Sequence, residues 1–202
     1  MPGDAVYWDD RYRTIGHANA SWYQHRPVLS LRLIEELEVG EDAAIVDVGG
    51  GASALVECLI DDGYIDLTVV DISADALEQA RAQIPHSHVE WVHADVRIWQ
   101  PTRVYEVWHD RATYHFLTDA ADQARYWQTA REHVHAGGFV IVAVFAEDGP
   151  TECSGLPVKR STVAELVAAM GEGFDVVKSE DEFHLTPGGA VQPFHWVVAK
   201  RV

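Results

Sequence analysis

The sequence predicts an α/β protein with a seven-stranded, mostly parallel sheet, a C-terminal antiparallel hairpin and helices on both faces. An apolar run at 43–48 leads directly into Gly49–Gly51 and then into a helix-compatible segment. Strand-like runs alternate with helical patterns along most of the chain, which indicates parallel strands joined by right-handed crossovers. The last two strand-like runs, 174–184 and 192–201, are separated by a short turn, 186–189, so we expect them to pair antiparallel.

The individual elements follow from local patterns. Residues 4–26 are rich in aromatic side chains without a strict period, which favours a cover over the main fold. Pro27 is suited to open a helix that ends at Gly40, and Gly137–Gly138 are expected to end a longer helix. Further helices are expected over 52–61, after the N-cap Ser73, over 119–135 and over 161–170. Further strands are expected over 43–48, 66–71, 88–93, 104–110 and 139–145. The segment 147–160 is expected to be a loop.

Length and composition limit the function classes. The 202 residues suit one domain, with 1–40 as a helical cover and 41–202 as the core. The net charge of −17 disfavours nucleic-acid binding. The sequence contains no apolar run of about 18 residues, so we expect no membrane span. The N-terminus does not resemble a secretory signal, and the two cysteines form no disulfide framework, so we expect a cytoplasmic protein. These features leave the oligomeric state open.

Acidic residues close three successive predicted strands: Asp47, Asp71 and Asp95. An acid after the second strand is placed to accept hydrogen bonds from both hydroxyls of a ribose, which favours an adenosine-containing ligand clamped by Asp71. Asp95, with the adjacent Val96, is expected near the adenine amino group. The glycine loop lacks the third glycine of a dinucleotide fingerprint and the Gly-Lys-Ser/Thr of a Walker loop, so a pyrophosphate ligand is disfavoured.

These segments are similar to those of the class I S-adenosylmethionine-dependent methyltransferases. The similarity is carried by 46–51, 70–73 and 94–96, together with the strand order and its final hairpin. It implies a Rossmann-like fold that binds S-adenosylmethionine and releases S-adenosylhomocysteine. Ser53 departs from the family, where glycine is more frequent at this position. The cofactor-binding residues that follow are Asp47, Gly49, Gly50 and Gly51 around the methionine part, Asp71 and Ile72 at the ribose, and Asp95 and Val96 at the adenine.

Residues 7–12, 21–24 and 109–117 resemble one methyltransferase-like branch more narrowly. That branch includes protein-lysine methyltransferases, such as the one acting on citrate synthase, and uncharacterised bacterial members. In the related enzymes the segment after the fourth strand lies between cofactor and substrate. The resemblance therefore implies that 109–117 faces the reaction.

Methyl transfer needs an aligned nucleophile and, for an ammonium or hydroxyl acceptor, a general base. Asp110 and His115 are the catalytic candidates, because they follow the fourth strand. The dispersed histidines and cysteines make no convincing ligand set, so no metal is expected. The candidates for substrate contact or for a lid are Trp22, Tyr23, Arg111, Cys153, Gln192 and His195.

The predicted function is methyl transfer from S-adenosylmethionine, with a small-molecule acceptor favoured by a chain that has little beyond the core fold. A protein-lysine acceptor is the alternative, because the branch includes such enzymes and an acidic surface attracts basic segments. Ser53 and the uncertain base keep open a non-catalytic cofactor-binding module. A nicotinamide-dependent reductase is opposed by the missing third glycine and by the terminal hairpin.

Overall fold

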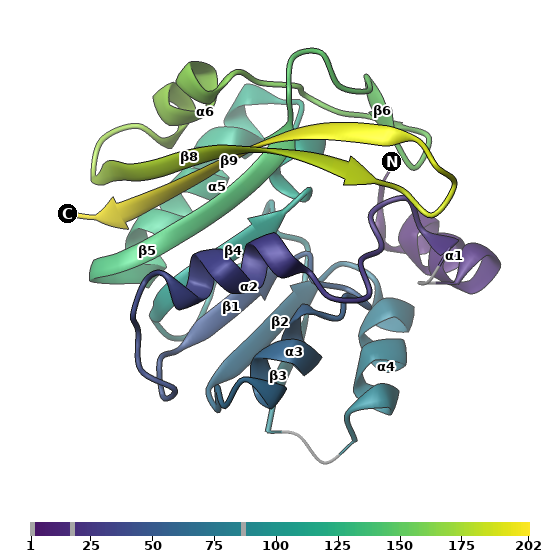
Figure 1. The fold of residues 1–202 in the computed structure, drawn as a ribbon, viewed down its shortest axis with the longest axis horizontal. Helices are drawn as coiled ribbons and strands as arrows, with labels where there is room; N and C mark the ends of the chain where they lie inside the picture. Colours follow the sequence, from purple (N-terminus) through teal and green to yellow (C-terminus); the bar gives the residue numbers. More distant parts are fainter. Residues whose placement is uncertain (1–2, 17–18, 86–87) are drawn as a thin grey trace.

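A computed structural model describes residues 3–16, 19–85 and 88–202, and within them seven strands form one sheet (Figure 1). These strands are β1 (Ile45–Val48), β2 (Leu67–Asp71), β3 (Glu90–His93), β4 (Tyr105–Arg111), β5 (Val134–Phe145), β8 (Phe174–Leu185) and β9 (Val191–Arg201). Their spatial order is β3-β2-β1-β4-β5-β9-β8. All neighbours are parallel except β9, which is antiparallel to both β5 and β8. The predicted sheet and its terminal hairpin are therefore confirmed.

Helices cover both faces of the sheet, as predicted (Figure 1). They are α1 (Ala5–Ile15), α2 (Val28–Glu35), α3 (Leu55–Asp61), α4 (Ala74–Gln83), α5 (Ala120–His133) and α6 (Val163–Met170), with a 3-10 turn η2 (Tyr114–Phe116). One hydrophobic cluster joins α2 and α3 to the sheet, and a second joins α5 and α6 to the opposite face. Burial on both faces explains why the central strands are continuous apolar runs rather than alternating ones.

Two helix starts show how the sequence sets the element boundaries. The Ser73 hydroxyl accepts a hydrogen bond from the Ala76 N–H at 3.1 Å, so the predicted N-cap is confirmed. Helix α6 has Thr162 as its N-cap, which forms a reciprocal capping box with Glu165. Each such cap stabilises its helix by about 1 kcal/mol.

Three predicted element boundaries differ from the structure. The helix expected to end at Gly40 already ends at Glu35, and turns follow it. The helix expected from residue 52 begins at Leu55, because 52–54 continue the glycine turn and the Ser53 hydroxyl accepts a hydrogen bond from the Leu55 N–H at 3.0 Å. The pair Gly137–Gly138 does not end a helix; α5 already ends at His133, and β5 runs through both glycines. Gly137 has φ +90°, and the register against β4 shifts nearby, so the glycines accommodate a bulge inside the strand.

The segment 147–160, expected as a loop, contains a small hairpin of β6 (Glu152–Cys153) and β7 (Leu156–Pro157). Its two turn residues, Ser154 and Gly155, have φ +54° and +77°. Both central residues of a tight hairpin turn of this kind take positive φ, which glycine adopts readily.

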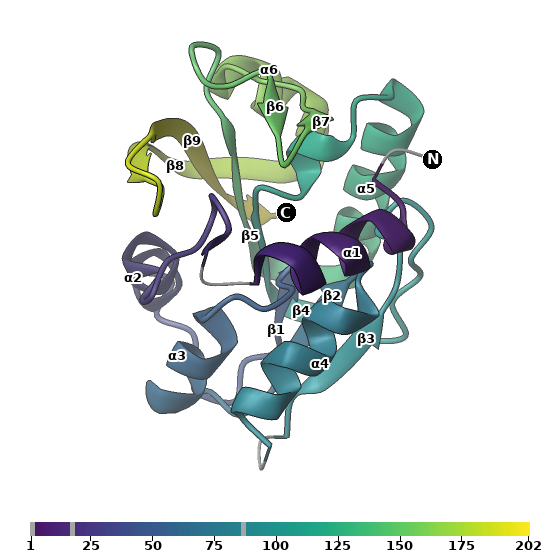
Figure 2. The same ribbon diagram turned by 90° about the vertical axis from the view of Figure 1, so that its right-hand side faces the viewer.

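The first helix, α1, lies at the carboxyl ends of the central strands, beside α4 (Figure 2). Its Asp9 carboxylate accepts hydrogen bonds from the Ser73 hydroxyl at 2.7 Å and from the Asp75 N–H at 3.2 Å. The Tyr7 hydroxyl donates to the Ser154 carbonyl. Helix α1 is thus attached to α4 on one side and to the β6–β7 hairpin on the other, while α2 packs into the core with α3.

Candidate functional site

Two cavities lie at the carboxyl ends of β1, β2 and β4, where ligands bind in open α/β sheets. The larger has a volume of about 310 Å³ and the smaller about 50 Å³. Trp22, Gly49 and Arg111 line both of them. The larger volume falls at the lower end of the range that small-molecule sites occupy, about 300–1,000 Å³.

The larger cavity brings together four of the residues predicted to hold adenosine: Asp71, Ile72, Asp95 and Val96. Asp71 is 8% exposed, and one of its oxygens accepts a hydrogen bond from the Ser73 N–H at 2.7 Å. Both oxygens of Asp95 accept from the Arg97 Nε at 2.9 Å. Asp95 is thus paired with an arginine of the same cavity, whereas Asp71 accepts hydrogen bonds from backbone N–H groups.

The glycine loop is held tightly between its neighbours. Gly49 and Gly51 have φ +68° and +49°, a region that residues with a Cβ rarely adopt. A Cβ on Gly49 would overlap the Thr113 side chain, and one on Gly51 would overlap the Tyr12 hydroxyl and lie 3.0 Å from Asp71 Oδ2. Gly49 lines both cavities, whereas Gly51 lines neither and lets Tyr12 and Asp71 approach the loop.

Asp47 lines the smaller cavity, together with Gly50 and Tyr23. Its carboxylate lies 2.7 Å from His109 Nδ1, and His109 Nε2 lies 3.0 Å from the Ser30 hydroxyl. All three polar groups are buried. The pair arises from the register of the sheet, because Asp47 on β1 lies opposite His109 on β4. The sequence did not predict the pairing of His109 with Asp47, since only the register of the sheet brings the two side chains together.

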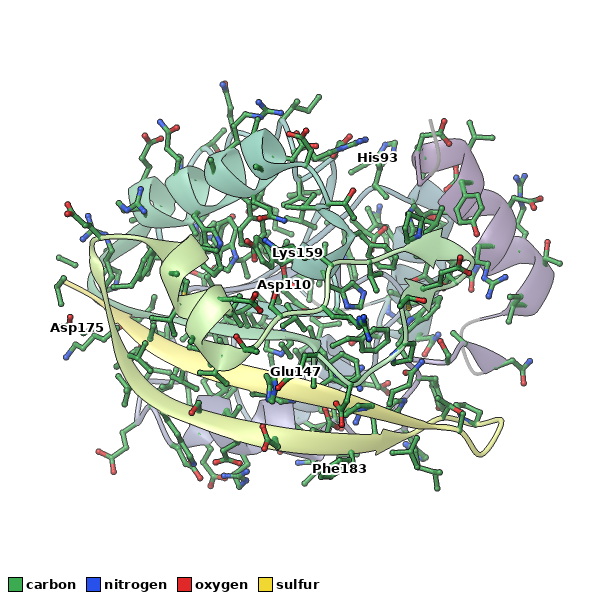
Figure 3. All side chains as sticks on the ribbon, turned by 90° about the horizontal axis from the view of Figure 1, so that it is seen from above. His93, Asp110, Glu147, Lys159, Asp175 and Phe183 are labelled. Atoms are coloured by element: carbon green, nitrogen blue, oxygen red, sulfur yellow. The ribbon has the colours of Figure 1, made fainter. Side chains whose placement is uncertain are left out.

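Asp110, labelled in Figure 3 and predicted as catalytic, is fully buried and lines neither cavity. Its carboxylate accepts hydrogen bonds from the N–H groups of Thr113 (2.9 Å) and Tyr114 (3.1 Å) and from the Tyr126 hydroxyl (2.6 Å). Burial raises its pKa to about 6. These contacts give Asp110 a positioning role, because it fixes the turn that places Thr113 at the larger cavity.

His115, the second catalytic candidate, is also fully buried and outside both cavities. Its ring packs against Phe116 and Phe145, at centroid distances of 4.6 and 4.7 Å. Burial, and then the charge of Arg111, lower its pKa to about 3. A histidine with this pKa is a weak base at neutral pH, so its environment disfavours the predicted role. The catalytic assignments of Asp110 and His115 stay predictions.

Four of the six predicted substrate or lid residues line the cavities: Trp22, Tyr23, Arg111 and Cys153. Burial raises the pKa of the Cys153 thiol, which disfavours a reactive thiolate. Gln192 and His195 line neither cavity. His195 lies instead between the carboxylates of Asp181 (2.6 Å) and Glu147 (2.7 Å), and Glu147 is labelled in Figure 3.

Several residues that line the larger cavity are not among the individual candidates of the sequence analysis. Trp8 and Tyr12 of α1 belong to the aromatic segment predicted as a cover, and Thr113 and Phe116 belong to the segment 109–117 that the resemblance places at the reaction. In the β6–β7 hairpin only Cys153 was a candidate, because strands of two residues have no periodicity. Arg97 and Leu156 also line the cavity without having been predicted.

Within residues 3–16, 19–85 and 88–202, no helix has the length and apolar character of a membrane span. No group of three or more histidine, cysteine, aspartate or glutamate side chains within the same ranges is arranged to hold a metal ion.

Known structures share this fold over nearly the whole chain. N-methyltransferase NodS from Bradyrhizobium japonicum WM9, in complex with S-adenosyl-L-homocysteine, has a TM-score of 0.73 at 13% identity, covering 98% of this chain and 99% of NodS. A structure described for the conversion of a disulfide bond into a thioacetal group during echinomycin biosynthesis has a TM-score of 0.76 at 16% identity, covering 98% and 92%. The glycopeptide N-methyltransferase MtfA, complexed with S-adenosyl-L-homocysteine, has a TM-score of 0.68 at 14% identity, covering 89% and 92%.

The sequence itself matches one family model. Residues 45–138 match the model of a methyltransferase domain, a range that runs from β1 into β5 and contains the glycine loop, Asp71 and Asp95. The structural neighbours show the fold. The match of residues 45–138 to a methyltransferase domain and the order of the sheet support a class I S-adenosylmethionine-dependent methyltransferase.

Proposed function

We propose that this chain transfers the methyl group of S-adenosylmethionine to a small-molecule acceptor. One observation carries the proposal: a single cavity is lined both by the acids Asp71 and Asp95 and by the aromatic side chains of Trp8 and Phe116. The Trp8 and Phe116 rings are in contact, with centroids 5.2 Å apart, and give the cavity an apolar wall.

The residues present fit the cofactor. The buried Asp71 carboxylate suits the two ribose hydroxyls, which are hydrogen-bond donors. The smaller cavity, with Asp47 and Gly50, suits the polar amino-acid end. Gly49 lines both cavities, so one elongated ligand passing the glycine loop contacts both.

When bound, the cofactor supplies a methyl carbon that is activated by the positive charge on sulfur. The part of the protein is to align the acceptor with that carbon and to exclude water. Helix α1 and the β6–β7 hairpin serve this purpose, because Trp8, Cys153 and Leu156 line the cavity from above the strand ends. Asp110 contributes indirectly through the position of Thr113.

A methyl-transfer screen tests the proposal. The protein is incubated with S-adenosylmethionine labelled on its methyl group and with a metabolite extract, and the products are separated into protein and small-molecule fractions. We expect label to accumulate in the small-molecule fraction in proportion to enzyme and time. Cofactor binding without label in either fraction would instead support the non-catalytic module.

A protein-lysine acceptor is the second candidate, and label in the protein fraction would support it. The net charge of −17 favours a basic partner segment, and the resemblance of 109–117 to the lysine-methylating branch points the same way. The buried guanidinium of Arg111 opposes it, because a lysine ammonium entering the larger cavity would meet a like charge.

The affinity for S-adenosylhomocysteine should fall as the pH is lowered below about 7. Burial raises the pKa of Asp71 to about 7, opposed by the Ser73 N–H and reinforced by the charges of Asp47 and Asp9. Ribose hydroxyls donate to the ionised carboxylate, so binding lowers this pKa and releases a proton at low pH. Affinity should therefore rise with pH, by up to about tenfold per unit well below the pKa, and level off above it.

Isothermal titration between pH 5.5 and 8.5 measures this dependence. Asp71→Asn carries no titrating group at the site, and its affinity should show a much flatter profile. A wild-type affinity that is constant from pH 6 to 8 would exclude Asp71 as the ribose acceptor.

A further inference from the structure

Arg111, the last residue of β4, lies where the two cavities meet and lines both of them. Its side chain is only 10% exposed. The Nη1 group donates a hydrogen bond to the Trp22 carbonyl at 3.0 Å, and the guanidinium lies 5.0 Å from the centre of the Phe194 ring. One edge of the guanidinium is therefore fixed by the protein.

The other donors of Arg111 are not used. Nε and Nη2 are buried and have no hydrogen-bond partner in the part of the chain that the structure describes. The Glu182 carboxylate pairs with the guanidinium, but its Oε2 is 3.7 Å from Nε, too far for a hydrogen bond. The oxygens of Glu182 accept instead from Gln24 Nε2 (2.8 Å) and Trp196 Nε1 (3.0 Å).

A second arginine of the larger cavity shows the contrast. Arg97 also lines it, but its Nε and Nη2 both donate to the Asp95 carboxylate. Arg97 is thus satisfied within the protein, whereas Arg111 presents two adjacent N–H donors. Burying such donors without an acceptor is costly, and a planar fork of two N–H groups matches the two oxygens of a carboxylate.

We propose that Arg111 binds a carboxylate group of a ligand held in these cavities, through Nε and Nη2. The inference rests on the proposed function, because that function defines the two ligands. The carboxylate has two possible sources, the amino-acid end of the cofactor and an acidic group on the acceptor. In the second case Arg111 selects acceptors that are organic acids and rejects cationic ones.

The first arm of the test compares S-adenosylhomocysteine with 5′-methylthioadenosine, which lacks the amino-acid carboxylate. Both are titrated into the wild-type protein, Arg111→Met and Arg111→Lys. If Arg111 holds the cofactor, Arg111→Met should weaken the binding of S-adenosylhomocysteine by about 10- to 100-fold and leave the affinity for 5′-methylthioadenosine unchanged. Arg111→Lys keeps the charge but not the planar fork of N–H donors, so its affinity for S-adenosylhomocysteine should lie between those of the wild type and Arg111→Met.

The second arm compares benzoate with benzamide, its neutral analogue of similar shape. Both are titrated into protein saturated with S-adenosylhomocysteine and into protein without it. If Arg111 holds the acceptor, the wild-type protein should bind benzoate more tightly than benzamide, and Arg111→Met should lose the preference. Arg103→Met is the matched control, because Arg103 pairs with Asp66 (2.8 Å) and lines neither cavity.

The two arms separate this proposal from the proposed function. If neither preference depends on Arg111, the carboxylate role is overturned even though the cofactor binds. If the wild-type protein binds neither adenosine ligand, the proposed function fails, and the benzoate arm without cofactor still decides the role of Arg111. Should Arg111→Met not fold in a thermal unfolding test, Arg111→Lys carries the same comparisons.

Discussion

Asp71→Asn should weaken the binding of S-adenosylhomocysteine by about 30-fold or more, roughly 2 kcal/mol, because hydrogen bonds to a charged acceptor are worth about 1.5–3 kcal/mol each. The substitution keeps the shape of the side chain at the large cavity and removes the charge that two ribose hydroxyls use. Isothermal titration at pH 8, where the wild-type carboxylate is ionised, measures the effect.

The control is Asp66→Asn, which changes an acid immediately before β2, outside both cavities, and should leave the affinity unchanged. Damage to the fold is tested separately. Because the pKa of Asp71 is raised in the folded protein, its contribution favours the folded state only at low pH and is lost as the pH rises toward 7. Asp71→Asn should therefore be at least as stable as the wild type at pH 8. If its affinity for S-adenosylhomocysteine were unchanged, Asp71 would not be part of the ribose site.

Asp110→Ala should lower the free energy of unfolding by about 3–5 kcal/mol, because it leaves buried donors without an acceptor. The Thr113 and Tyr114 N–H groups and the Tyr126 hydroxyl all lose their acceptor at once. Urea denaturation, followed by circular dichroism, measures the change.

Asp119→Ala provides the comparison. Asp119 is an exposed N-cap of α5 that accepts from Ala121 and Asp122, so its loss should cost only about 1 kcal/mol. A stable Asp110→Ala protein that binds cofactor normally but transfers no methyl group would restore the catalytic role predicted for Asp110.

Much of the fold was predictable because its strands are buried on both faces and therefore appear as apolar runs. The terminal hairpin was equally accessible, since a short turn between two strands allows only antiparallel pairing. The path of β5 was not, because Gly137–Gly138 are typical of a helix end, and only the register against β4 shows that a bulge accommodates them. The β6–β7 hairpin was missed because two-residue strands have no periodicity.

The site was predictable only in part. Asp71 and Asp95 could be found because the carboxyl ends of parallel strands meet at one edge of the sheet. Asp110 and Arg111 are neighbours on β4, yet successive side chains of a strand point to opposite faces. The structure places Asp110 in the interior and Arg111 at both cavities, a distinction that depends on register and not on local pattern. The His109–Asp47 pair depends on register in the same way.

The central claim is that the cavity beside the glycine loop binds S-adenosylmethionine. Isothermal titration of the wild-type protein with S-adenosylhomocysteine at pH 8 tests it most directly. We expect one ligand per chain with a dissociation constant in the micromolar range, about −7 to −8 kcal/mol. No detectable binding at ligand concentrations of hundreds of micromolar would contradict the claim.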